Sequence, residues 1–135
     1  MGSKTRVLIV DDEERFRSTM QKLLTIRGFE TATAGSGQEA LEELDRNNSY
    51  DVVILDVRMP DMTGVQVLPA IKKRDPHMEV IIMTGYASVD TAKEILKQGA
   101  YDYMLKPYSI EELVDKIEAA RDRRKARLDA TRTDD

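Results

Sequence analysis

Three short apolar runs constrain the fold more than any other feature of this sequence. They are rich in β-branched residues and span 7–10 (VLIV), 52–55 (VVIL) and 80–83 (VIIM). A strand with one wet face would alternate apolar and polar residues, whereas a continuous run suits a strand covered on both faces, as in a parallel sheet. Two weaker strand candidates, 29–34 and 101–105, lie between and after these runs.

Amphipathic segments of helical length separate the strands. The first carries a stripe of Phe16, Met20, Leu23 and Leu24, and Gly28 is suited to close it. Capping boxes are expected to open three further helices: Ser36 with Glu39, Thr63 with Gln66, and Ser109 with Glu112. In the remaining helix, Ile95 and Leu96 are expected to face the core, while Pro69 should weaken or kink its own helix.

This alternation predicts an α/β fold. Strand followed by helix, five times, gives right-handed crossovers and a parallel sheet with helices on both faces. We therefore expect a five-stranded, parallel, doubly wound sheet of order 2-1-3-4-5 with five helices. In such sheets ligands bind at the carboxyl ends of the strands, near the switch point between strands 1 and 3.

Composition narrows the function classes. The 135 residues fit one domain, and the mixed charges sum to −4, which does not favour direct nucleic-acid binding. Because there is no cysteine, disulfides, thiol catalysis and zinc–thiolate sites are excluded. No run is long enough to span a membrane and no signal-peptide core is present, so a cytoplasmic location is the default expectation.

The strand ends carry the chemistry. Four of the five expected strands end in polar groups: Asp11 and Asp12, then Asp56, Thr84 and Lys106. Carboxylates that lie close together repel one another unless a cation compensates, and oxygen ligands with open water positions suit Mg²⁺. A lysine can pair with a phosphoryl oxygen, and an aspartate can act as a nucleophile that forms an aspartyl phosphate.

Four segments carry a family resemblance: VLIVDDEERFR, DVVILDVRMPDMTG, VIIMTGYA and GAYDYMLKPYS. Together they resemble the receiver domain of bacterial two-component response regulators, which has a flavodoxin-like, CheY-like fold, and the last two are similar to receivers of NtrC-type σ54 activators. The resemblance covers roughly residues 5–120, nearly the whole chain, and we expect the receiver domain at 4–122. Because receivers are among the folds from which the switch-point rule was drawn, the rule and the resemblance are not independent.

The resemblance implies roles for particular residues. Asp56 would accept the phosphoryl group, and Mg²⁺ would be held by Asp11, Asp12, Asp56 and the backbone carbonyl of Arg58. Thr84 and Lys106 would contact the phosphoryl group. Thr84 and Tyr103 would act as the conformational switch, and the bond before Pro107 would be cis, which an X-Pro bond permits.

It also implies partners. A sensor histidine kinase would donate the phosphoryl group. The donor histidine would lie on that other protein, because the only histidine here, His77, lies in a polar loop without a second metal ligand nearby. An effector domain or other output partner, or a second copy, would bind the face formed by the fourth helix, the fifth strand and the fifth helix. The domain would slowly hydrolyse its own acyl phosphate and turn over no external substrate, so it would not be an enzyme.

Two rival functions fit parts of the pattern. A haloacid-dehalogenase-like phosphatase also uses a nucleophilic Asp, Mg²⁺, Thr or Ser, and Lys, but it needs a second Asp where this chain has Arg58. A receiver that is never phosphorylated and serves only for interaction would not need its intact acidic residues.

The segment 123–135 is polar and continues the helical pattern, with a basic cluster from Arg121 to Arg127. Two interpretations stay open: a solvated helix end that frays into a tail, or a linker toward an effector domain that this chain does not carry.

Overall fold

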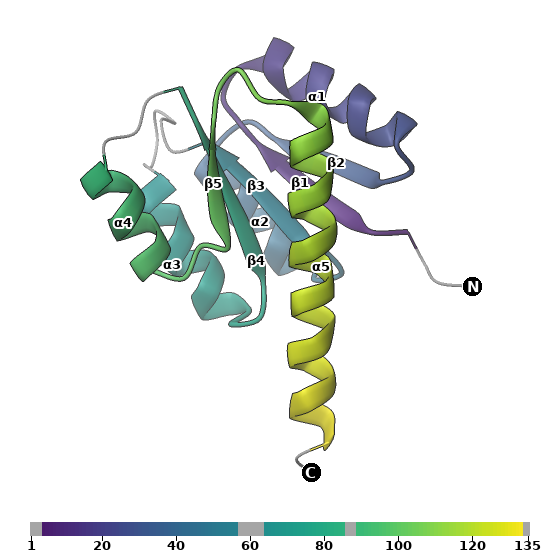
Figure 1. Cartoon of the computed structure of the whole chain (residues 1–135), viewed down its shortest axis with the longest axis vertical. Helices are drawn as coiled ribbons and strands as arrows, with labels where there is room; N and C mark the ends of the chain where they lie inside the picture. Colours follow the sequence, from purple (N-terminus) through teal and green to yellow (C-terminus); the bar gives the residue numbers. More distant parts are fainter. Residues whose placement is uncertain (1–3, 57–63, 86–88, 134–135) are drawn as a thin grey trace.

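The computed structural model describes residues 4–56, 64–85 and 89–133. Five strands alternate with five helices along the chain: β1 (Arg6–Val10), α1 (Glu14–Ile26), β2 (Glu30–Ala34), α2 (Gly37–Arg46), β3 (Val52–Asp56), α3 (Gly64–Arg74), β4 (Glu79–Thr84), α4 (Val89–Lys97), β5 (Asp102–Leu105) and α5 (Ile110–Thr133). All neighbouring strands are parallel and the order is β2-β1-β3-β4-β5. The predicted doubly wound sheet is confirmed (Figure 1).

The continuous apolar runs are explained by two separate cores. Successive residues of a strand point to opposite faces, so one run fills both cores. On one face, Leu8, Val53 and Ile82 pack with residues of α2, α3 and α4. On the other, Ile9 and Ile54 pack with residues of α1 and α5. The central strands β3 and β4 are buried along their whole length, which fixes the positions of the residues at their ends.

Local signals fix several helix ends. The Ser36 hydroxyl accepts a hydrogen bond from the Glu39 N–H, and the Glu39 carboxylate accepts one from the Gly35 N–H, so the first capping box forms. The Glu112 N–H donates to the Ser109 hydroxyl at the start of α5. Gly28 closes α1 with φ of 94°, a conformation that side chains other than hydrogen disfavour. Thr63 of the remaining predicted box lies outside the described residues.

Two expectations about helix interiors fare differently. Helix α3 runs from Gly64 to Arg74 and does not end at Pro69, which is exposed. In α4, Ile95 is fully buried as predicted, but Leu96 is 43% exposed, so the expectation that it faces the core is wrong. A periodic pattern gives the direction of a side chain on its helix, and it does not tell whether another element covers that direction.

Helix α5 continues unbroken to Thr133 and projects beyond the end of the sheet (Figure 1). Its basic cluster contacts the start of β4. The Arg123 and Arg127 guanidinium groups lie 3.1 Å and 3.8 Å from the carboxylate of Glu79, which is fully buried, and Arg124 pairs with Asp75 at 3.0 Å. No helix in 4–56, 64–85 or 89–133 is both long and apolar enough to cross a membrane.

Candidate functional site at the carboxyl edge of the sheet

The sheet brings the predicted site residues to one edge. Asp56 and Thr84 are the last residues of β3 and β4, the two central buried strands. Asp11 directly follows β1, and its N–H still donates to the Ala34 carbonyl of β2 at 3.1 Å. Lys106 directly follows β5, and its N–H donates to the Thr84 carbonyl at 2.7 Å. Backbone pairing of four strands or their ends therefore positions four of the predicted site residues.

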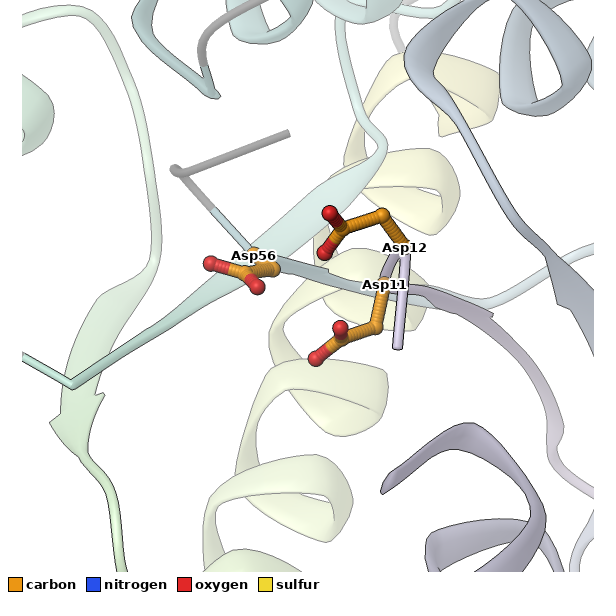
Figure 2. Close-up of side chains that lie close together, drawn as sticks. All are labelled: Asp11, Asp12 and Asp56. Atoms are coloured by element: carbon orange, nitrogen blue, oxygen red, sulfur yellow. The ribbon is translucent and has the colours of Figure 1, made fainter. Parts of the chain in front are cut away.

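Three carboxylates gather in this crevice. Each of Asp11, Asp12 and Asp56 offers an oxygen, and these oxygens lie within 4.8 Å of one another. Figure 2 shows the three side chains converging from the ends of β1 and β3. Asp11 and Asp56 are only 2% and 5% exposed, whereas Asp12 is exposed. A regular strand would send Asp11 and Asp12 to opposite faces, and they share one crevice because β1 ends at Val10.

Lys106 links the two buried acids. Its ammonium donates to Asp11 Oδ2 at 3.0 Å and to Asp56 Oδ2 at 3.3 Å. Burial by itself would lower the pKa of this ammonium, but the hydrogen bond to Asp11 and the charges of both carboxylates outweigh burial and raise the pKa. Lys106 therefore stays charged at neutral pH and offsets one of the negative charges.

Asp11 is held from two sides. Its Oδ1 accepts a hydrogen bond from the Glu13 N–H at 2.9 Å, and its carbonyl accepts one from the Arg17 guanidinium at 2.8 Å. Burial raises the pKa of the Asp11 carboxyl and the charge of Asp56 adds to this, while the Glu13 N–H and Lys106 act in the opposite direction. The net pKa is raised, chiefly because burial disfavours the charged carboxylate.

The remaining predicted residues are placed unevenly. Thr84 is fully buried, and the half-buried Tyr103 packs against the core on the α2, α3 and α4 side of the sheet. The Lys106–Pro107 peptide bond is cis, the geometry that the resemblance implied. Arg58 lies outside the described residues, so its carbonyl is not placed.

The donor set fits a hard divalent cation. Carboxylate oxygens are the ligands that Mg²⁺ prefers in proteins, and it is usually bound by few carboxylates with water at other positions. The exposure of Asp12 leaves one side of the cluster open to water. A cation bound there would also offset the mutual repulsion of three carboxylates whose oxygens lie within 4.8 Å of one another.

One contact of the site has no counterpart in the sequence-based prediction. Phe16, expected only as part of the apolar stripe of α1, lies with its ring centroid 4.0 Å from the Lys106 Nζ. The only available signal was its position one helical turn after Asp12, which points it toward the carboxyl edge of the sheet.

Comparisons with known proteins agree with the geometry. The family model for the response regulator receiver domain matches residues 7–118. Among curated proteins, the regulatory protein AtoC of Escherichia coli K12 is 42% identical over 84% of this chain and 24% of its own length. The DNA-binding transcriptional regulator NtrC of Klebsiella pneumoniae is 40% identical over 83% of this chain and 24% of its own length. The chain thus spans about a quarter of the length of these relatives.

Solved structures give the same result. A response regulator receiver domain from Clostridium thermocellum superimposes with a TM-score of 0.87 and 41% identity, covering 90% of this chain and 98% of that one. A beryllofluoride-activated NtrC4 receiver domain dimer gives a TM-score of 0.83 and 39% identity, covering 88% and 98%. These matches favour a receiver over the phosphatase alternative. The chain therefore belongs to the response regulator receiver domains, the phosphorylation-activated switches of two-component signalling, and is homologous to the receivers of NtrC-type σ54 regulators.

Proposed function

We propose that Asp56 is the phosphoacceptor of this domain and that the crevice around it binds Mg²⁺ for the reaction. The observation that supports this most is the Lys106 ammonium, which bridges two nearly buried carboxylates. An oxygen of a third carboxylate lies within 4.8 Å of oxygens of these two. A lysine placed in this way can exchange a carboxylate for a phosphoryl oxygen without moving far.

The donor would be a phosphohistidine on a sensor histidine kinase. An oxygen of the Asp56 carboxylate attacks the phosphorus, the new O–P bond forms, and the imidazole nitrogen leaves with the electron pair of the broken N–P bond. Bound Mg²⁺, held by Asp11, Asp12, Asp56 and the carbonyl of Arg58, would supply neutralisation of the negative charge on the phosphoryl oxygens.

Side chains of this domain then contact the phosphoryl group on Asp56. Lys106 pairs with one phosphoryl oxygen and the hydroxyl of Thr84 donates to another. Movement of Thr84 lets the Tyr103 ring turn inward, which changes the surface of α4, β5 and α5. The domain later hydrolyses its own acyl phosphate and has no turnover on an external substrate.

The face of α4, β5 and α5 is the proposed output surface. Leu96 of α4 and Leu105 of β5 are 43% and 52% exposed, so both side chains are accessible to a partner. An output domain or a second copy of the chain would bind this face, in keeping with the NtrC4 receiver neighbour, which is a dimer.

We further propose that residues 4–122 are the receiver part of a longer transcriptional regulator and that 123–135 belong to the linker toward an effector domain. The short share of the relatives' length supports this. Any contact with DNA would then lie outside this chain.

The direct test is incubation with acetyl phosphate and Mg²⁺, followed by intact mass. We expect one phosphoryl adduct, which is lost when Mg²⁺ is chelated and in Asp56→Asn. Asp45→Asn is the matched control, because Asp45 lies exposed on α2, where it pairs with the Arg74 side chain. An adduct that survives Asp56→Asn would refute the assignment, and steady turnover of a phosphate ester would favour a phosphatase instead.

A further inference from the structure

The Lys106 ammonium has a third neighbour besides its two carboxylates. An ammonium carries three N–H donors, and hydrogen bonds to Asp11 and Asp56 use two of them. The face of the Phe16 ring lies on another side, with its centroid 4.0 Å from Nζ. The face of an aromatic ring carries the negative part of its quadrupole and attracts a cation. Phe16 therefore contacts Lys106 as a neutral electrostatic partner.

The Phe16 ring is itself fixed by packing. The Tyr108 ring meets it edge to face, with centroids 5.6 Å apart and an interplanar angle of 73°. Both rings also pack against the core between the sheet and helices α1 and α5. Because Phe16 is on α1 and Tyr108 lies just before α5, the position of the ring depends on the packing of two helices.

The charged partners of Lys106 change during the reaction proposed above, but the ring does not. In that reaction Asp56 would become an acyl phosphate, and Asp11 would gain a metal ion as a further partner. A phenyl ring neither titrates nor coordinates Mg²⁺, so its attraction for the ammonium is the same before and after transfer.

We propose that Phe16, backed by Tyr108, is a positioning residue that holds the Lys106 ammonium where a phosphoryl oxygen on Asp56 arrives. This inference rests on the proposed function. It makes the aromatic face, in addition to the hydrophobic volume of the side chain, a requirement for fast phosphoryl transfer.

A fluorination series separates the aromatic face from the packing. Replacing Phe16 with mono-, di- and trifluorophenylalanine withdraws electron density from the ring at nearly constant shape. The readout is the rate constant for phosphorylation at saturating acetyl phosphate and Mg²⁺. We expect it to fall with each fluorine, and to be about three- to thirty-fold lower in Phe16→Leu, while Phe16→Tyr keeps the wild-type rate. The midpoint of urea unfolding should stay nearly constant along the fluorinated series.

Phe29→Leu is the matched control. Phe29 is the other phenylalanine of the chain, it is buried in the same core, and no cation–ring contact of the described segments involves it. We expect this variant to unfold at lower urea concentration but to be phosphorylated at the wild-type rate once folded.

Two results would overturn the inference while leaving the proposed function intact: a constant rate along the fluorinated series, or a Phe16→Tyr variant as slow as Phe16→Leu. A wild-type protein that takes up no phosphoryl group would overturn both, and that result is visible before any variant is compared.

Discussion

The buried carboxylate of Glu79 allows a prediction in which removing its arginine partners and removing the acid itself have unequal effects on stability. Glu79 opens β4 and is fully buried, while its partners Arg123 and Arg127 are 51% and 37% exposed. Neither carboxylate oxygen has a partner with hydrogen-bond geometry among the described residues, so the contact is an ion pair alone. The carboxylate is desolvated in the folded protein and the guanidinium groups are only partly so.

The magnitude follows from this asymmetry. At the 3.1 Å separation of Arg123 and Glu79, Coulomb's law with an effective dielectric constant of about 20 gives attraction on the order of 5 kcal/mol. Removing the partner of a buried charge lowers stability by about 3–5 kcal/mol. Lys72, whose charge also interacts with Glu79, remains in place, so we take the lower end. Arg123→Ala with Arg127→Ala should therefore lower the free energy of unfolding by about 3 kcal/mol.

Removing the acid should be much milder. In Glu79→Met the buried charge is gone, the new side chain is apolar, and the two arginines rehydrate, so we expect a change within about 1 kcal/mol. Combining Glu79→Met with both arginine substitutions should recover most of the stability that the arginine variant loses.

Urea unfolding followed by circular dichroism, at constant m-value, measures all three proteins. If Glu79→Met loses as much as the double arginine variant, or if the triple variant shows no recovery, the cost does not come from an uncompensated buried carboxylate. The reasoning would then be wrong, and the α5 extension would be held by something other than charge.

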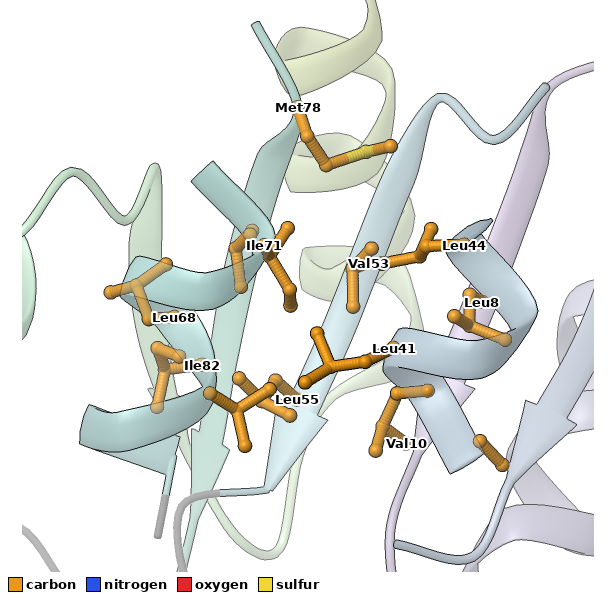
Figure 3. Packing of buried hydrophobic residues seen from close by; sticks show 14 of the residues in the cluster. Leu8, Val10, Leu41, Leu44, Val53, Leu55, Leu68, Ile71, Met78 and Ile82 are labelled. Carbon is orange, nitrogen blue, oxygen red and sulfur yellow. The ribbon is translucent and has the colours of Figure 1, made fainter. Parts of the chain in front are cut away.

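Two further predictions concern stability. Burial and the hydrogen bond to Glu43 raise the pKa of Tyr50 from 10.0 to about 12. The contribution of the neutral Tyr50 hydroxyl to the free energy of unfolding is therefore fully present below about pH 10 and is lost as pH rises toward 12. Tyr50→Phe should be about 1 kcal/mol less stable at neutral pH. Above about pH 10 the free energy of unfolding of the wild-type protein should fall relative to this variant by about 1.4 kcal/mol per pH unit, so in urea titrations the deficit should vanish within the first unit and then reverse; an unchanged deficit would contradict the assignment. Ile71 is fully buried between α3 and the sheet (Figure 3), so Ile71→Ala should lose about 2–5 kcal/mol in the same assay. The same change at Ile26, which is 79% exposed, should stay within about 0.5 kcal/mol, and equal losses at the two sites would show that burial is not what stabilises α3.

The sequence was sufficient for the fold because the decisive signals are local. A continuous apolar run needs cover on both faces wherever it lies, and alternating helices leave few topologies that obey right-handed crossovers. The strand ends then bring Asp11, Asp56, Thr84 and Lys106 to one edge without any further information about distant contacts.

The contacts that were not predicted all depend on distant residues. Phe16 was correctly assigned to an apolar stripe, but its contact with Lys106 joins α1 to the residue after β5. Leu96 has the spacing of a core residue and is exposed because no described element covers it. The cluster from Arg121 to Arg127 resembles a solvated helix end in sequence, and its partner Glu79 lies more than forty residues earlier.

Buried acids at the two ends of the sheet illustrate what separates a structural group from a functional one. Glu79, at the amino end, meets two arginines and the nearby charge of Lys72, so its negative charge is compensated within the chain. At the carboxyl end, Asp11 and Asp56 share Lys106 while an oxygen of Asp12 lies within 4.8 Å of theirs, and burial together with the charge of Asp56 raises the pKa of Asp11. Both sites contain an acid at a strand end beside basic residues, so residue type alone does not distinguish them. The balance of charge does, because an uncompensated buried carboxylate lowers stability unless a cation or a phosphoryl-transfer role explains its presence.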